Sequence, residues 1–277
     1  MNAGFPHGGN RRALAGASGR RPEDILDASA SLNPLGPPDW LRTVISANVA
    51  ELAHYPDPEA AALLEAAAVR YGAPAEAFAA GNGTSQLLFA LPGLTGLARA
   101  VIPLPAYADY ATACRQAGLD VRSLPPSEDG VFAIAPEALA AALTAPSLVI
   151  LGSPGNPAGR VFPAQAIRAL ADRHPESLFV VDEAFADFVE GFVSLAGDRP
   201  ANVAVLLSLT KSFAVPGLRL GLAAAAPALA DRLRRALPPW SVNSLARPWA
   251  CAPWPTRTFC AAPGPPCPAC ATGWPRG

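Results

Sequence analysis

Residues 203–213 read Val203-Ala204-Val205-Leu206-Leu207-Ser208-Leu209-Thr210-Lys211-Ser212-Phe213, an apolar run that leads into the single lysine of a chain with twenty arginines. A guanidinium cannot give up its proton to become a nucleophile, whereas a desolvated amine can, and the amine can then condense with a carbonyl. Lys211 is therefore a candidate Schiff-base lysine. The alternative is a solvated lysine that remains in a sequence rich in Arg, Ala, Gly and Pro, and the count alone favours neither.

Other short apolar runs resemble strands and alternate with helical patterns. The strand-like runs are 100–104, 119–124, 147–151, 178–181, 203–207 and 218–223. The helical patterns are 58–71, 84–91, 136–143, 163–173 and 227–237. Continuous apolar strands separated by helices predict an α/β fold, with a mostly parallel sheet that carries helices on both faces.

The composition limits the classes of partner. The chain has 277 residues, 51% of them hydrophobic and 16% charged, with a formal net charge of -1. No basic stripe favours nucleic acid as a partner. Residues 1–19 lack the apolar core of a signal peptide, and no run reaches the roughly 18 residues of a membrane span. We therefore expect a cytoplasmic protein that binds neither nucleic acid nor a membrane.

Four of the five cysteines lie in the last 27 residues. Cys267-Pro268-Ala269-Cys270 has the spacing of half a zinc site or of a redox pair. The surrounding segment, 247–277, is rich in Pro, Cys and Trp and shows neither a helix nor a strand period. The sequence therefore favours an atypical tail over a zinc protein, and we expect no metal.

Polar residues follow the ends of three strand-like runs, where ligands bind to such sheets. They are 153–157, 182–185 and 208–211. Asp182 ends an apolar run, so its carboxylate should be partly or wholly buried and needs a cation, such as a protonated ring nitrogen, or several donors. Asn156 lies in a Pro/Gly turn, where Asn often only closes the turn. The structural alternative for Asp182 is a helix cap or an ion pair.

A glycine turn, Gly81-Asn82-Gly83-Thr84-Ser85, precedes the 84–91 helix, where free N–H groups favour an anion such as phosphate. An ordinary capped helix is the alternative, and Arg219 taken singly resembles a surface arginine. Together, a carbonyl-capturing amine, an acid for a pyridinium, a donor for a phenolate oxygen and a phosphate cradle are what pyridoxal phosphate needs.

At this point the chain resembles the class I/II, fold-type I pyridoxal-phosphate enzymes. The lysine signature is 208–213 with Pro216-Gly217-Leu218-Arg219-Leu220-Gly221, and the order Gly-Asn-Gly-Thr-Ser, Asn-Pro, Asp-Glu-Ala and Lys matches the family from about His7 to Ala246. Within the family it looks most like the threonine-phosphate decarboxylases of cobalamin biosynthesis, close relatives of histidinol-phosphate aminotransferases. The segments that carry this likeness are His7-Gly8-Gly9-Asn10, Asp27, 31–36, His54-Tyr55-Pro56-Asp57 and Phe185-Ala186-Asp187-Phe188.

The resemblance implies a role for each matching residue. Lys211 and Asp182 would be catalytic, the first as the Schiff-base lysine and the second as the partner of the pyridine nitrogen. Asn156 would hold the phenolic oxygen and Tyr107 would stack on the ring. The cofactor phosphate would be held by Gly83, Thr84, Ser85, Ser208 and Arg219, and by Tyr55 from a neighbouring subunit, which implies a homodimer. The residues near a phosphorylated amino-acid substrate would be His7, Gly8, Gly9, Asn33 and Asn156.

The resemblance also implies a reaction and a domain division. The reaction is decarboxylation of L-threonine O-3-phosphate to aminopropanol phosphate; the alternatives are an aminotransferase of the histidinol-phosphate type and a cofactor-binding remnant without turnover. Phe185 stands where many aminotransferases of this fold carry Tyr, which weakens the aminotransferase alternative and is compatible with the decarboxylase branch; Ser31 stands where that branch carries Asn. We expect an N-terminal arm (1–38), a large domain (39–246) and the tail (247–277), with the C-terminal small domain missing.

Overall fold

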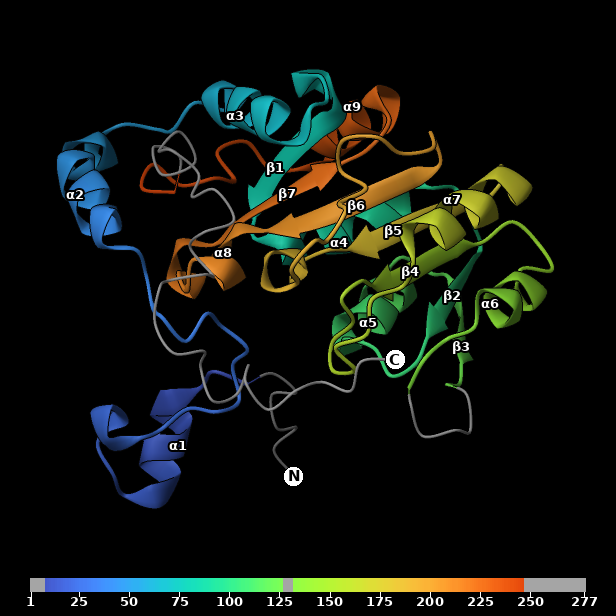
Figure 1. Cartoon of the computed structure of the whole chain (residues 1–277). Helices are drawn as coiled ribbons and strands as arrows, with labels where there is room; N and C mark the ends of the chain where they lie inside the picture. The colour runs from blue at the N-terminus through green and yellow to red at the C-terminus, as the bar shows by residue number, and fades with distance from the viewer. Residues whose placement is uncertain (1–7, 127–131, 247–277) are drawn as a thin grey trace.

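A computed structural model describes residues 8–126 and 132–246. Its centre is a seven-stranded sheet with the order β1-β7-β6-β5-β4-β2-β3 (Figure 1). The strands are β1 (Phe78–Asn82), β2 (Arg99–Pro103), β3 (Asp120–Leu124), β4 (Leu148–Gly152), β5 (Leu178–Asp182), β6 (Val203–Ser208) and β7 (Leu220–Ala224). β7 runs antiparallel to β1 and β6, and the other pairs are parallel.

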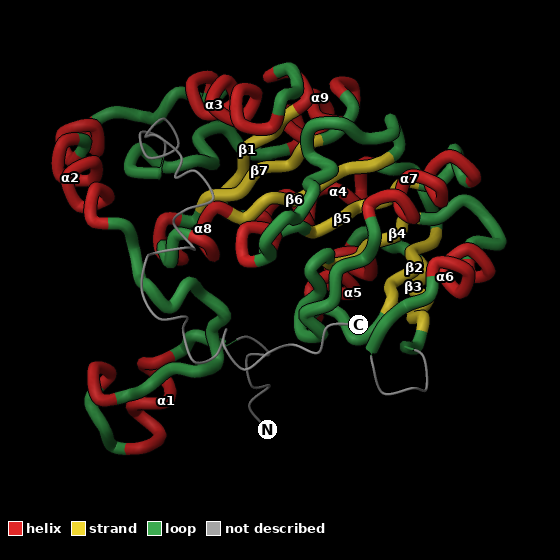
Figure 2. Tube along the Cα trace, in the orientation of Figure 1, coloured by secondary structure: helices red, strands yellow, loops and turns green. Residues whose placement is uncertain are grey.

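Helices cover both faces of the sheet (Figure 2). The buried side chains form one cluster on each face. One cluster takes residues from α2 (Asp39–Ala47), α3 (Ala61–Tyr71), α6 (Pro136–Ala142) and α7 (Ala164–Arg173). The other takes residues from α4 (Thr84–Leu94), α5 (Ala108–Gln116) and α9 (Pro227–Ala236). The remaining helical elements are α1 (Arg11–Ser18), α8 (Leu209–Ser212) and the 3-10 turns Pro22–Asp24, Val49–Ala53, Ala75–Ala77, Ala186–Phe188 and Pro216–Leu218.

Side chains alternate between the two faces of the sheet along β5, and this alternation determines the face on which each carboxyl at the end of β5 lies. Val181 belongs to the cluster under α3 and α7, whereas Val180 belongs to the cluster under α4 and α5. Because successive side chains point to opposite faces, Asp182 turns toward α5 and Glu183 toward the other face. One strand end thus delivers two adjacent carboxyls to different surroundings.

The predicted α/β fold with a mostly parallel sheet is confirmed, and the differences are local. β1, α1, α2, α5 and the one-turn α8 had no counterpart among the predicted elements. α3 begins at Ala61 rather than at Pro58, because the Asp57 carboxylate accepts hydrogen bonds from the N–H groups of Glu59 and Ala61, both at 2.9 Å. Asp57 thereby ends the preceding loop and satisfies a free N–H group at the start of the helix.

One buried residue of the N-terminal segment, Asn33, is hydrogen-bonded to α8 beside the sheet. Figure 1 shows α1 apart from the sheet and α2 closer to it. Asn33 is buried, its N–H donates to the Lys211 carbonyl at 3.1 Å, and its Nδ2 donates to the Ser212 carbonyl at 2.8 Å. The segment is therefore fastened directly to the lysine helix α8. None of the helices in the described ranges is long and apolar enough to cross a membrane.

Candidate active site

A pocket opens where β4, β5 and β6 end and α4 begins, and it brings together most of the predicted site residues. Nine of them line it: Gly83, Thr84, Ser85, Tyr107, Asn156, Asp182, Ser208, Lys211 and Arg219. The other lining residues are Tyr110, Pro154, Ala184, Phe185 and Thr210. The placement follows from the topology, because the carboxyl ends of neighbouring parallel strands meet at one edge of the sheet.

Asp182 forms the floor of the pocket as the last residue of β5. Its Oδ2 accepts a hydrogen bond from the Tyr110 hydroxyl at 2.8 Å, and its Oδ1 accepts one from the Ala184 N–H at 3.0 Å. Burial raises the pKa of the carboxyl, while these two donors and the charge of Lys211 act in the opposite direction. A cation bound above Asp182 would offset the cost of burying the charge.

Lys211 lies in α8, the one-turn helix that directly follows β6. Burial is the largest cause that lowers the pKa of its amine, Arg219 lowers it further, and Asp182 opposes both. Among the residues that the structure describes, no hydrogen bond or ion pair engages the amine. Lys211 is therefore a partly buried amine whose neutral, nucleophilic form is more accessible than that of an exposed lysine.

The start of α4 forms the anion cradle. Gly83 has φ 77 and ψ 164 at the helix N-cap, and no side chain caps the first turn. A Cβ at Gly83 would collide with the guanidinium of Arg219, and a Cβ at Gly221 of β7 would overlap the backbone of Gly83 and Thr84. The two glycines thus allow strand, helix start and arginine to approach closely. Exposed N–H groups at a helix start beside a cation are a site for phosphate.

Hydroxyl and amide groups complete the pocket wall. Ser208 and Thr210 are buried, with their hydroxyl oxygens 3.0 Å apart. Tyr107 caps α5 at its N-terminus, and its hydroxyl donates to Asp109 at 2.8 Å. An amine, a partly buried carboxylate, an anion cradle and the amide of Asn156 surround one space, and this donor set fits pyridoxal phosphate. Asp182 would hold the ring nitrogen and Lys211 would meet the aldehyde.

Other predicted residues lie away from the pocket. Tyr55 is 81% exposed and its ring lies 4.6 Å from that of Trp240. Gly8 and Gly9 are exposed beside Ser29, whose Oγ accepts from the Gly9 N–H at 2.9 Å. The Asn33 side-chain amide is engaged by backbone groups: its Nδ2 donates to the Ser212 carbonyl of α8, and its Oδ1 accepts from the Leu35 N–H. Their roles stay predictions.

His7, the Cys267–Cys270 pair and the whole tail lie outside the described residues. Within the described part of the chain, no group of three or more His, Cys, Asp or Glu side chains is arranged to hold a metal ion.

Tyr110 and Thr210 are site residues that the sequence reasoning missed. Tyr110 is buried, contacts Asp182 through its hydroxyl, and packs edge-on against Tyr107 with ring centroids 5.6 Å apart. A helix assigned to this segment would have revealed it, because residues three apart at a helix start share a face. Thr210 lies within the lysine signature and carried no separate signal.

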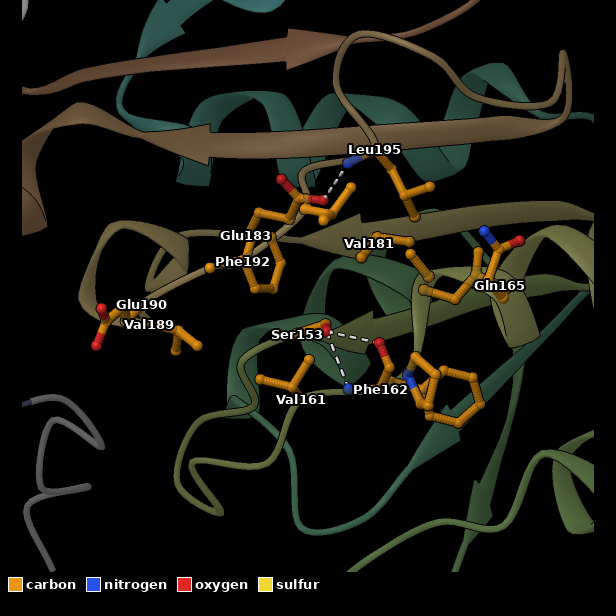
Figure 3. A pocket seen from close by; sticks show the side chains of 15 residues that line it. Ser153, Val161, Phe162, Gln165, Val181, Glu183, Val189, Glu190, Phe192 and Leu195 are labelled. Atoms are coloured by element: carbon orange, nitrogen blue, oxygen red, sulfur yellow. Dashed lines mark hydrogen bonds between the residues drawn. The ribbon is translucent and has the colours of Figure 1, made fainter. Parts of the chain in front are cut away.

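A second, larger cavity of about 440 Å³ lies on the other side of the same strand ends (Figure 3). Its walls are mostly apolar, with Val161, Phe162 and Phe192 among the lining residues, and Glu183 is its buried carboxyl. Glu183 accepts hydrogen bonds from the Ser194 hydroxyl and the Leu195 N–H. Burial raises the pKa of Glu183 to about 7. This cavity lacks an amine or an anion cradle among its described lining residues, so the chemistry lies in the smaller pocket.

Comparison with known proteins places these features in a family. The model of the family "Aminotransferase class I and II" matches residues 24–254. The chain is 38% identical to the threonine-phosphate decarboxylase of Salmonella typhimurium, over 87% of this chain and 67% of that protein. It is 33% identical to the adenosylcobalamin biosynthesis bifunctional protein CobDQ of Leptospira interrogans, over 87% of this chain and 28% of that protein.

A solved structure adds the same fold with its cofactor. The histidinol-phosphate aminotransferase of Sinorhizobium meliloti, solved in complex with pyridoxal-5'-phosphate, is 26% identical, with a TM-score of 0.78 over 90% of this chain and 68% of that one. The predicted cofactor, pyridoxal phosphate, is thereby confirmed for the family. Because the family model matches most of the chain, this protein belongs to the aminotransferase class I and II family of pyridoxal-phosphate enzymes.

Proposed function

We propose that this chain is the cofactor-binding part of a threonine-phosphate decarboxylase, which converts L-threonine O-3-phosphate to aminopropanol phosphate and carbon dioxide in cobalamin biosynthesis. The observation that carries the proposal is the convergence of Lys211, Asp182 and the Gly83 cradle on one pocket. The identity to the Salmonella typhimurium decarboxylase favours this substrate. Phe185 also lines the pocket and brings no hydroxyl to it.

Pyridoxal phosphate, when bound, supplies an aldehyde that captures an amine and a ring that takes up the electrons of the bond broken at the α-carbon. The residues of the protein would hold the cofactor and orient it. Gly83, Thr84, Ser85 and Arg219 would hold the phosphate, and Asn156 would donate to the phenolic oxygen. These contacts would fix the orientation of the cofactor and, with it, that of the substrate.

Asp182 and Lys211 would control two protons, the one on the ring nitrogen and the one that reaches the α-carbon. The Asp182 carboxylate would hold the ring nitrogen in its protonated form and so strengthen the electron withdrawal that the cofactor supplies. In the proposed reaction the substrate loses its carboxylate as carbon dioxide and its α-carbon gains a proton. Lys211 would donate that proton from its ammonium form, which its lowered pKa makes a better acid than an exposed lysine.

The main rival is transamination of histidinol phosphate or a related amine, for which the same pocket residues would serve. The chain resembles an enzyme of this kind as well. Incubating the purified protein with each substrate separates the two. Carbon dioxide released from threonine phosphate without an amino acceptor supports decarboxylation, whereas glutamate formed from 2-oxoglutarate and histidinol phosphate would contradict it. Cofactor absorbance without either product would indicate a remnant without turnover.

The assembly is part of the proposal. In a homodimer, the exposed Tyr55 would reach the cofactor phosphate of the neighbouring subunit, and the Gly8 and Gly9 segment would lie near the substrate. The proposed domain division is the arm 1–38, the large domain 39–246 and the tail 247–277, in a cytoplasmic protein. Sedimentation with and without pyridoxal phosphate tests the assembly, and a chain that stays monomeric would contradict the role of Tyr55.

A further inference from the structure

We propose that Tyr110 is a positioning residue that fixes the Asp182 carboxylate and keeps it anionic, ready to pair with a protonated ring nitrogen. This inference rests on the proposed use of pyridoxal phosphate at this site. It concerns a residue that lies in the pocket wall and carries none of the roles assigned above. The contact it makes joins α5 to the end of β5.

The geometry of the contact is well defined. Tyr110 is 2% exposed, and its hydroxyl donates to Asp182 Oδ2 at 2.8 Å. Asp182 Oδ1 is held separately by the Ala184 N–H. Both oxygens of the carboxylate therefore have a donor from the protein, one from backbone and one from a side chain, and the plane of the carboxylate is fixed by the pair.

The surroundings leave room for this hydroxyl and hold its ring. A Cβ added to Gly152, the last residue of β4, would lie 3.1 Å from the Gly155 Cα and 3.2 Å from the Tyr110 hydroxyl oxygen. The Tyr107 ring packs edge-on against the Tyr110 ring at an interplanar angle of 81°. Tyr107 faces the pocket, and Tyr110 faces the Asp182 carboxylate. Both side chains therefore come from the start of α5. Because Gly152 has no side chain, the Tyr110 hydroxyl has room to reach Asp182.

Four other ionisable groups surround Asp182. Lys211 in α8 attracts it, whereas Tyr107, the N-cap of α5, and Glu183, the residue after Asp182, interact with its negative charge unfavourably when ionised. Burial, followed by the charge of Asp182, raises the pKa of Tyr110 well above its usual value, so the phenol stays a donor. The hydroxyl is therefore a neutral donor that favours the charged carboxylate without adding a competing cation.

The test compares Tyr110→Phe with Tyr107→Phe. Tyr107→Phe is the matched control, because it also removes one phenol near the pocket but breaks a hydrogen bond to Asp109 instead. The first measurement is the titration of the Asp182 carboxyl in ligand-free protein by ¹³C NMR, with Asp182→Asn to identify its signal. Tyr110→Phe should raise the proton affinity of Asp182 about tenfold or more, because hydrogen bonds to a charged group are among the stronger ones. Tyr107→Phe should change it less than about threefold.

The second measurement is the affinity for pyridoxal phosphate from pH 5 to 8. In Tyr110→Phe the loss of affinity on acidification should begin at a higher pH, in step with the shifted carboxyl titration. Gly152→Ala, whose Cβ would crowd the Gly155 backbone as well as the hydroxyl without removing the hydroxyl, provides a second variant and should change both measurements in the same direction.

Three results would overturn the inference. One is an unchanged Asp182 titration in both Tyr110→Phe and Gly152→Ala. Another is a shifted titration with an unchanged pH profile of cofactor binding, which would leave the hydrogen bond real but without a role toward the cofactor. The third is a wild-type chain that binds no pyridoxal phosphate at any pH. That result would refute the proposed function as well. The titration of Asp182, which is measured in ligand-free protein, would still show whether Tyr110 affects the carboxyl, so the two failures can be told apart.

Discussion

Replacing Glu183 by Gln should make the protein more stable at alkaline pH. Glu183 is 3% exposed, and burial raises the pKa of its carboxyl from 4.5 to about 7 although the Ser194 hydroxyl and the Leu195 N–H both donate to it. At 1.36 kcal/mol per pKa unit, that rise corresponds to about 3 kcal/mol of stability lost when the carboxyl must ionise in the folded state.

The sign follows from which state holds the proton. Below about pH 4.5 the carboxyl is protonated in both states, and Glu183 imposes no penalty. Between about pH 4.5 and 7 the unfolded chain releases the proton and the folded chain keeps it, so the free energy of unfolding falls as the pH rises. Above about pH 7 the penalty is complete. Gln cannot ionise, and its carbonyl oxygen still accepts from the Leu195 N–H.

The assay is urea unfolding followed by circular dichroism between pH 5 and 8. The free energy of unfolding of Glu183→Gln minus that of the wild type should rise over this range by about 2 to 3 kcal/mol. Glu190→Gln, an exposed carboxyl of the same loop, is the matched control and should leave a difference that does not vary with pH. A pH-independent difference for Glu183→Gln would refute the reasoning.

Three further outcomes are expected. Gly83→Ala places a Cβ against Arg219 at a φ of 77, so it should weaken binding of pyridoxal phosphate about tenfold or more but that of pyridoxal far less; equal losses would contradict the cradle. Lys211→Arg should abolish borohydride-fixed cofactor on the chain, and a label on another residue, found by mass spectrometry, would disprove the assignment. Phe179→Ala in β5 should cost about 3 to 5 kcal/mol in urea unfolding, and a loss under about 1 would show that the core is not packed as described.

Much of the sheet was predictable from the sequence because its strands are continuous apolar runs. β4, β5 and β6 were predicted to within about one residue, and their ends carry the polar residues of the pocket. The positions of Asp182 and Lys211 in one pocket followed, since ends of neighbouring strands meet at one edge. The assignment of individual contacts to the cofactor came from the family resemblance.

The missed elements have local causes. β1 begins with Phe78 and two alanines and ends in Gly81-Asn82, which Gly83 follows, and such a stretch is typical of a turn rather than of a strand. The antiparallel direction of β7 carries only a weak signal: the connection from Ser208 to Leu220 is at the lower limit for a parallel crossover, which needs about a dozen or more residues. The hydrogen bond from Tyr110 depends on how α5 packs, and no local pattern encodes it.

The fastening of Asn33 to α8 makes the N-terminal segment and Lys211 a single mechanical unit. Pulling the segment away would strip one donor from the Lys211 carbonyl and another from the Ser212 carbonyl, at a one-turn helix that has little rigidity of its own. Cleavage upstream of Asn33, or a neighbouring molecule that displaces the segment, would therefore shift the backbone of α8. That shift would move the reactive amine without any direct contact with the pocket.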